Sequence, residues 1–318
     1  MSDISGPAIA NPPPPSVIVA IPTFRRPERL RYLLEALNRQ STNRRIGILV
    51  ADNDADKRQG QMVVNRLVPG TFRFPIHAIV VERRGLASIR NALLAEALQS
   101  PSVRHVAMID DDEWPDPDWI ESLVSMQEQT AADIVGGPVY AAFETRTSAS
   151  LAACRLFRPY KNPGGPIDIV WATNNVLLTR ACLDGTRNDW FDECYGLSGG
   201  EDTDYFVRQR MRGRRFAWAP AAIVHESIPS SRTRYLWVLR RAFRIGTTNA
   251  NIQRRRGFRG RTTASVVTIA AAKLVTALAG LPIRALLVRG RADALCDLAE
   301  AGGMLLGSFG YRFDEYSK

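Results

Sequence analysis

The chain has 318 residues and 45% of them are hydrophobic, so it can bury a sizeable core in roughly two domains, or in one large domain with appendages. Its four cysteines show no paired spacing of metal ligands, which favours free thiols in a reducing compartment. The net charge of +10 is local, because fourteen Lys or Arg residues and no Asp or Glu lie between Glu226 and Asp293, leaving 28 basic against 32 acidic residues elsewhere. This basic span predicts contact with an anionic surface or polyanion.

Residues 1–16 contain Pro12 to Pro15 and lack both a basic start and an apolar run. They predict a flexible tail rather than a secretory signal, so the folded part of the chain is expected in the cytoplasm.

Strand and helix patterns alternate through the first third of the chain. β-branched or apolar runs at 17–21, 46–50, 76–81 and 106–109 read as strands, and the segments at 27–37, 62–67 and 86–98 read as helices. Repeated strand-to-helix units predict an α/β fold with a parallel sheet and helices on both faces.

Polar residues follow each predicted strand, and the carboxyl ends of parallel strands share one edge of a sheet. Arginines and carboxylates at that edge suit a nucleotide diphosphate. The sequence holds neither a Gly-x-Gly-x-x-Gly turn after the first strand nor a Walker loop, which argues against a dinucleotide dehydrogenase and a P-loop enzyme. The residues at this edge are Thr23 and Arg25, Asp52 and Asp54, Arg83 and Arg84, and Asp110 to Asp112.

The three consecutive carboxylates Asp110, Asp111 and Asp112 are the most informative stretch. Adjacent carboxylates repel each other unless a cation lies between them, and a hard divalent ion bound to a phosphate suits oxygen ligands. In an extended segment Asp110 and Asp112 would share one side and Asp111 would point away. The triplet alone is equally compatible with a solvated loop that caps the next helix before Pro115 and Pro117.

The second half of the pattern holds further candidates. A helix at 120–128, a strand from Ile134 and a strand at 169–178 precede a glycine-containing loop that leads into a helix beginning at Glu201. Carboxylates in a first helical turn also favour the helix dipole, whether or not they catalyse a reaction. A strand at 216–224 is expected to end at His225, and a lone histidine there is more often structural than a metal ligand.

Taken together, these stretches resemble glycosyltransferase family 2, the inverting GT-A class, and within it bacterial exopolysaccharide glycosyltransferases of the succinoglycan type. The resemblance covers about residues 17 to 246 and implies a GT-A, Rossmann-like, mostly parallel sheet. Its pieces are VAIPTFR (19–25), the strand end at Asp52, GLASIRN (85–91), IDDDE (109–113), GGEDTD (199–204) and the strand end at His225.

The resemblance also implies residue roles. Asp112, with His225, would bind Mn²⁺ or Mg²⁺ against the diphosphate of a nucleotide-sugar donor, most simply a UDP-sugar. Asp202 would be the general base that deprotonates the acceptor hydroxyl, with Glu201 and Asp204 as alternatives. The donor itself would contact Pro22, Thr23, Arg25, Asp52, Arg83, Arg90, Asp110 and Asp111.

The carboxyl-terminal part departs from processive members of the same family, because no Gln-x-x-Arg-Trp motif is present; a single-addition enzyme is expected. Residues 235–244 fit an amphipathic helix at an anionic membrane, and a core-packed helix fits equally well. The apolar segment 264–288 is interrupted by Lys273, Pro282 and Arg284, which favours one or two helices in the membrane interface, with the basic cluster 254–261 on anionic lipid.

The expected organisation is therefore a tail (1–16), a catalytic domain (17–226) and a membrane-associated helical region (227–318) on the cytoplasmic face of the inner membrane. A lipid-linked saccharide or growing polysaccharide would be the acceptor. Two other interpretations are a metal-dependent nucleotidyltransferase and a basic nucleic-acid-binding protein, the latter prompted by an isoelectric point near 9.9. Nucleic acid is not an expected partner, because binding it would leave the acidic edge without a purpose.

Overall fold

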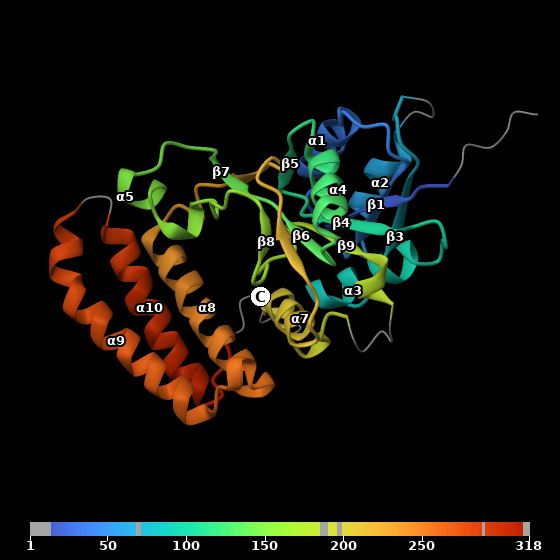
Figure 1. Cartoon of the computed structure of the whole chain (residues 1–318). Coiled ribbons are helices and arrows are strands. Elements are labelled where there is room, and N and C mark those ends of the chain that lie inside the picture. Colours follow the sequence, from blue (N-terminus) through green and yellow to red (C-terminus); the bar gives the residue numbers. More distant parts are fainter. Residues whose placement is uncertain (1–13, 68–70, 185–189, 196–198, 288–289, 314–318) are drawn as a thin grey trace, which may run out of the picture.

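The structure, a computed structural model, describes residues 14–67, 71–184, 190–195, 199–287 and 290–313. The predicted tail lies outside the described residues except for residues 14–16. An α/β unit and a unit of long helices make up the described chain (Figure 1).

The large sheet has eight strands in the order β3-β2-β1-β4-β9-β6-β10-β8. β1 pairs in parallel with both β2 and β4, while β9 runs antiparallel between β4 and β6. The predicted mostly parallel sheet is confirmed, and its connectivity reverses direction between β1 and β4, the point at which open α/β sheets bind ligands. The strand bounds are β1 (Val17–Thr23), β2 (Ile46–Asp52), β3 (Ile76–Val80), β4 (His105–Ile109), β6 (Ile134–Gly136), β8 (Gly165–Ile167), β9 (Asn175–Thr179) and β10 (Phe216–Trp218).

Helices cover both faces of this sheet. α1 (Pro27–Asn38), α2 (Gln59–Asn65) and α4 (Trp119–Thr130) bury their apolar stripes on one face, and α3 (Leu86–Ala97) and α7 (Glu201–Met211) on the other. In α1 the leucines at 30, 33, 34 and 37 all point into the core, and Pro27 begins the helix where a missing amide hydrogen costs nothing.

A smaller sheet has three strands in the order β5-β11-β7, and its strand β5 follows shortly after the end of β4. It contains β5 (Glu113–Pro115), β11 (Val224–Ile228) and β7 (Val139–Phe143). The strand predicted at 216–224 is in fact two strands, β10 in the large sheet and β11 in the small one, because the chain turns between them at Pro220. The strand predicted at 169–178 is likewise shorter, because only its end, within β9 (Asn175–Thr179), pairs with neighbouring strands.

The carboxyl-terminal unit consists of α8 (Tyr235–Arg256), α9 (Thr263–Leu286) and α10 (Arg291–Ser308), of which α10 was not predicted. α10 lies between α8 and α9 (Figure 1). The segment containing α5 (Ala149–Ala152) and η1 (Arg155–Phe157) packs on α8 and α10 through an apolar cluster that includes Phe157, Val238 and Cys296. The remaining short helices are α6 (Arg180–Leu183), η3 (Glu193–Tyr195) and η4 (Phe258–Gly260).

Candidate active site

The aspartate triplet lies in a turn directly after β4, at the reversal point of the sheet. Asp111 accepts hydrogen bonds from the Thr23 hydroxyl at 2.8 Å and from Arg26 at 2.9 Å, and the same guanidinium donates to Asp112 at 3.0 Å. Asp110 instead faces Arg90, with 3.5 Å between oxygen and nitrogen. The expectation that Asp110 and Asp112 share one side is wrong, because the chain turns here instead of remaining extended.

Two glutamates that were not predicted as site residues join this cluster. Glu113 and Glu226 are opposite each other in the β5-β11 pair. Glu113 accepts a hydrogen bond from the backbone N–H of Asp110 at 2.9 Å. Burial raises the pKa of Glu226 to about 7, with further repulsion from Asp112, and burial also raises the pKa of Glu113 well above its usual range. The triplet and the two glutamates thus put five acidic side chains at one strand edge.

Arg232, in the segment between β11 and α8, counters part of this charge. Its guanidinium lies 2.9 Å from Glu226 and 3.3 Å from Asp112. Arg29 of α1 lies 3.7 Å from the same Asp112 oxygen. Asp112, the expected metal ligand, therefore has arginines on several sides.

His225 is not brought to Asp112. Its Nε2 atom lies 2.9 Å from Asp116, and its ring stacks on Trp114 with centroids 5.5 Å apart. Successive side chains of a strand point to opposite faces, so β11 directs Glu226 toward the carboxylates and His225 away from them. The alternation of side chains along a strand would have predicted that His225 and Glu226 face opposite sides, if β11 had been predicted as a separate strand.

The carboxylate edge fits a divalent ion in its donor chemistry. Within the described ranges, no group of three or more His, Cys, Asp or Glu is arranged to hold a metal ion. Mg²⁺, however, is usually held by one or two carboxylates together with substrate phosphates rather than by a protein cage. Burial raises the pKa of Asp110, and repulsion from Asp112 and Asp202 adds to this while Arg90 opposes it, so a cation there would relieve real crowding.

Arg90 joins the β4 end to the start of α7. The residue is 4% exposed, and its guanidinium donates a hydrogen bond to Glu201, the first residue of α7. Burial raises the pKa of Glu201, and Arg90 opposes that shift. The two motifs that lie about a hundred residues apart in the sequence therefore share one buried ion pair.

The three candidate bases in the first turn of α7 have different surroundings. Glu201 is 2% exposed and bound to Arg90, and Asp204 is fully buried. Asp204 accepts hydrogen bonds from Tyr195 at 3.0 Å and from Arg208 and Arg256 at 2.8 Å. Asp202 is half-buried, and its charge lies close enough to Asp110 to contribute to the raised pKa of Asp110.

The loop before α7 is shaped by α8. Gly199 and Gly200 have φ angles of +73° and +100°, a backbone region that residues other than glycine rarely adopt. A Cβ atom on Gly199 would lie 2.1 Å from the Arg244 guanidinium, and one on Gly200 would lie 2.2 Å from a methyl group of Thr248. The glycines thus allow α8 to approach the backbone that carries Asp202.

The other residues predicted to bind the nucleotide-sugar lie at the same edge of the sheet. Asp52, Arg25 and Arg83 bond there to other groups of the protein. Asp52 is fully buried and accepts hydrogen bonds from the backbone N–H groups of Asp54 (2.9 Å), Gly60 (2.6 Å) and Gln61 (3.1 Å), which holds the loop into α2. Arg25 pairs with Asp54 at 2.9 Å, and Arg83 is 71% exposed and pairs with Glu193. Pro22 lies within β1, beside Ala51 of β2.

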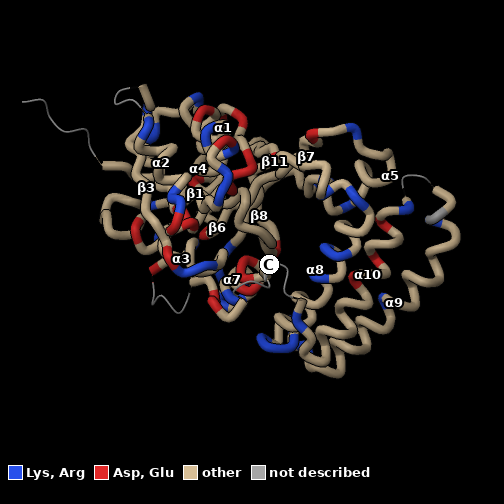
Figure 2. The backbone as a smooth tube through the Cα atoms, turned by 180° about the vertical axis from the view of Figure 1, so that it is seen from behind, with Lys and Arg blue, Asp and Glu red and all other residues tan. Residues whose placement is uncertain are grey.

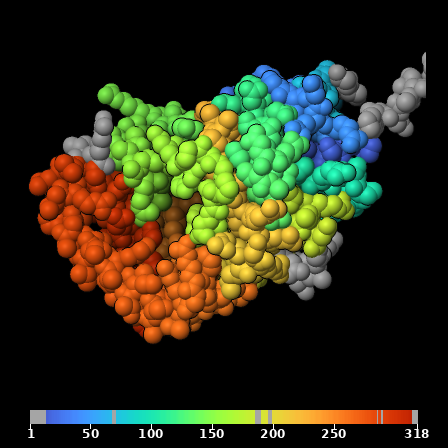
Figure 3. All heavy atoms as spheres, viewed as in Figure 1, coloured from blue at the N-terminus to red at the C-terminus, as the bar shows by residue number. Residues whose placement is uncertain are grey.

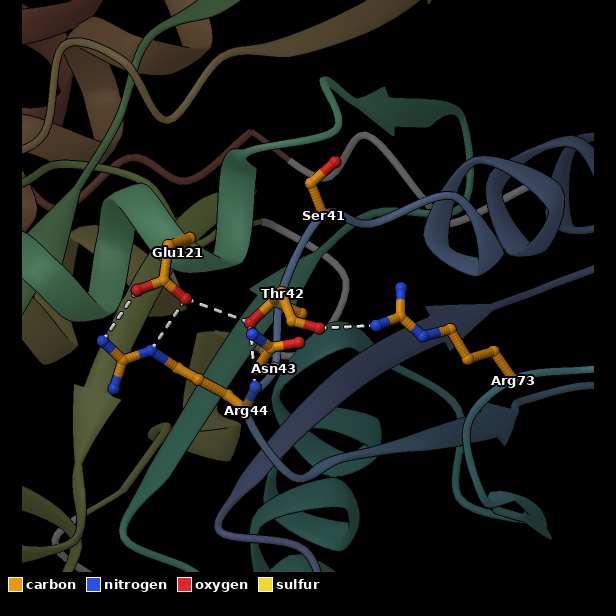
Figure 4. A pocket seen from close by; sticks show the side chains of 6 residues that line it. All are labelled: Ser41, Thr42, Asn43, Arg44, Arg73 and Glu121. Atoms are coloured by element: carbon orange, nitrogen blue, oxygen red, sulfur yellow. Dashed lines mark hydrogen bonds and ion pairs between the residues drawn. The ribbon is translucent and has the colours of Figure 1, made fainter.

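A surface cavity of about 640 Å³ lies elsewhere, at the amino end of β2 (Figure 4). Arg44 pairs there with Glu121 at 2.9 Å, and Arg73 donates to the backbone carbonyls of Gln40 and Thr42 at 2.5 Å. Because these cations are already satisfied and the catalytic candidates lie at the opposite strand ends, this cavity is not part of the site.

Comparison with known proteins agrees with this arrangement. The sequence model described as Glycosyl transferase family 2 matches residues 18–186. The chain is 31% identical over 246 residues to succinoglycan biosynthesis protein ExoM of Rhizobium meliloti (strain 1021), covering 74% of each chain. Its fold is similar to that of S. aureus TarS 1-349, solved with UDP-GlcNAc (TM-score 0.54) and alone (0.51), at 15% identity over 90% of each chain. The α/β core, the acidic strand end and these matches together show that the chain is a glycosyltransferase belonging to family 2.

Proposed function

We propose that this enzyme transfers one sugar from a nucleotide-sugar, a UDP-sugar in the simplest case, to a lipid-linked saccharide or a growing polysaccharide, with inversion at the anomeric carbon. Membership of family 2 supports a nucleotide-sugar donor and sets aside the nucleotidyltransferase and nucleic-acid-binding interpretations. The absence of a Gln-x-x-Arg-Trp motif supports a single addition.

The observation that carries the proposal is the difference among the three acids at the start of α7. Glu201 and Asp204 are buried and held by arginines, whereas Asp202 is only partly buried and lies beside the Asp110 edge. A general base must reach the acceptor hydroxyl. We therefore assign to Asp202 the removal of the hydroxyl proton while the acceptor oxygen attacks from the face opposite the leaving diphosphate.

Asp110 and Asp112 are the residues that would hold Mn²⁺ or Mg²⁺, and we leave His225 out of the set because it faces Asp116. When bound, the ion would offset the negative charge that grows on the departing diphosphate. Arg26 and Arg232 lie at the same carboxylates and would add fixed positive charge beside the leaving group.

Asp202→Asn tests the base assignment. We expect transfer to fall by about a hundredfold or more, because general-base catalysis is typically worth that much. Binding of UDP, followed by calorimetry, should be unchanged, and the anomeric configuration of the wild-type product, read by NMR, should be inverted. Near-normal transfer by this variant, or a retained configuration, would contradict the proposal.

Asp112→Asn, with His225→Ala as the matched control, tests the metal. The affinity for UDP should rise with Mn²⁺ in the wild type and in the His225 variant, and that gain should be lost or strongly reduced without the Asp112 charge. If UDP affinity is insensitive to Mn²⁺ and to EDTA in the wild type, the enzyme does not use a metal for donor binding.

We further propose an anionic membrane surface, on the cytoplasmic face of the inner membrane, as the place of action. One helix of the described chain, residues Thr263–Arg284, is long and apolar enough to cross a membrane, with a mean hydropathy of 1.9 and only 17% of it buried. Sedimentation of the expressed protein with the membrane fraction tests this assignment.

A further inference from the structure

α9 forms the outer edge of the carboxyl-terminal unit and presents an apolar side to solvent. Val275 is 65% exposed, Ile283 70% and Leu286 80%. In Figure 2 the α9 tube is mostly tan, with few charged positions, and Figure 3 shows the helical unit projecting to one side of the α/β unit. Such a surface is unusual for a protein fully surrounded by water.

We propose that α9 lies flat in the interface of a phospholipid membrane, held there mainly by its apolar side chains, and does not cross the bilayer. The inference deepens the proposed function, on which it rests, by naming how the enzyme reaches a lipid-linked acceptor. Length cannot decide between crossing and lying flat, because 24 residues extend about 36 Å and the hydrocarbon core is about 30 Å thick.

Ion pairs join the middle and the carboxyl-terminal end of α9 to α10. Lys273, near the middle of α9, lies 3.3 Å from Glu300, and Arg284, near its end, pairs with Asp297. A crossing helix would carry Lys273 to the bilayer centre, either with Glu300 or without it. Charged groups there are rare and costly.

α10 is in turn joined to the segment between β7 and β8, and the chain beyond it is joined to α8. Arg155 pairs with Glu300, and Arg158 pairs with Asp293. Past the end of α10, the carbonyl of Tyr311 accepts a hydrogen bond from Asn251 of α8 at 2.8 Å. The chain therefore returns to the side it left. Crossing by α9 alone would break all of these contacts, and crossing by α9 together with α10 would break those of Arg155 and Arg158.

The basic cluster 254–261, expected to pair with anionic lipid, is largely engaged within the protein. Arg256 lies 2.8 Å from Asp204 and Arg259 lies 2.8 Å from Asp168, while Arg255 donates to Cys194. Arginines already paired with carboxylates attract lipid headgroups weakly. Attachment through α9 should accordingly resist salt, which screens charges but not apolar contacts.

Flotation with vesicles of phosphatidylcholine and phosphatidylglycerol tests the attachment on the full chain. We expect the wild type to float with vesicles in 0.1 M and in about 1 M NaCl, where the screening length is only about 3 Å. Ile283→Glu should lower the bound-to-free ratio by about tenfold or more, because it puts a charge in the inserted face. Met62→Glu is the matched control, an exposed apolar residue on α2 of the α/β unit, and should float like the wild type.

Labelling distinguishes a flat helix from an α9 that crosses the bilayer alone. Cys194 is exposed in the α/β unit, the other three cysteines are buried, and Tyr311 beyond α10 is 49% exposed. In inverted membrane vesicles from expressing cells, a membrane-impermeant maleimide should label both Cys194 and a Tyr311→Cys variant without detergent. Labelling of the Tyr311 position only after detergent would overturn the inference in favour of a crossing helix.

Two further outcomes would also overturn it. Release of the wild type by 1 M NaCl would show electrostatic attachment, and absence from vesicles together with a concentration-dependent dimer in sedimentation would show that a second copy covers α9. UDP binding, measured by calorimetry on the same preparations, separates the two proposals. If Ile283→Glu loses vesicle binding but still binds UDP, only membrane attachment has been affected. If the wild type floats with vesicles but binds no UDP, only the proposed function is contradicted.

Discussion

Replacing Gly303 by alanine tests the close packing of α8 against α10, on which both the helical unit and the loop before α7 depend. A Cβ atom at this position would lie 2.1 Å from the carbonyl oxygen of Phe243, 2.9 Å from its carbonyl carbon and 3.1 Å from its Cα. All three are main-chain atoms that cannot rotate away as a side chain can. α10 must therefore move away from α8 by roughly 1 Å to restore an ordinary van der Waals contact.

The expected magnitude follows from two opposing effects. Overpacking costs about 1–3 kcal/mol, and a rigid backbone obstacle favours the upper end. Alanine recovers about 1 kcal/mol relative to glycine inside a helix. The net loss in free energy of unfolding should be about 2 kcal/mol.

Gly302 is the matched control, because a Cβ there meets nothing within 4 Å. Gly302→Ala should stabilise the protein by about 0.5–1 kcal/mol. Urea unfolding in mild detergent, followed by tryptophan fluorescence, compares the two variants, and hydrogen exchange in α10 shows where protection is lost. If Gly303→Ala were as stable as Gly302→Ala, the close approach of α8 and α10 would be refuted.

The remaining predictions concern the buried charges of the site. Arg90→Met should lower the free energy of unfolding by about 3–5 kcal/mol, since it leaves Glu201 buried without its partner. Arg83→Met, at an exposed ion pair, should change the free energy of unfolding by no more than about 0.5 kcal/mol in the same urea unfolding assay, and equal effects of the two variants would contradict the burial of Arg90. Glu226 has a pKa of about 7 when folded against an ordinary value of 4.5, so its protonated form is favoured by folding. Its contribution is present below about pH 4.5 and is lost as pH rises through 7. Glu226→Gln should therefore flatten the decline in Tm between pH 5 and 8, and an unchanged decline would place the titration elsewhere.

Local structure, and the sheet edge at which the site residues gather, could be predicted from the amino-acid pattern. Apolar runs such as 17–21 and the leucine spacing of α1 predicted strands and helices, because burial on one or both faces imposes a period that is visible in the chain. The same alternation of strand and helix predicted a parallel sheet, and with it the gathering of the Asp110 triplet at the carboxyl ends of strands. Boundaries failed where a turn interrupted an apolar run, as between β10 and β11.

Which side chains meet in the site depends on contacts between distant segments. Nothing local to Glu201 indicates that Arg90, 111 residues away, would hold it and leave Asp202 as the accessible acid. The register of β11 placed Glu226, rather than His225, among the carboxylates. The apolar composition of α9 permits a crossing helix, whereas its ion pairs with α10 and the contacts of α10 with the rest of the chain favour a flat one. Periodic burial fixes the conformation of a segment, whereas contacts between distant segments depend on strand order, register and helix docking, which no short stretch of sequence encodes.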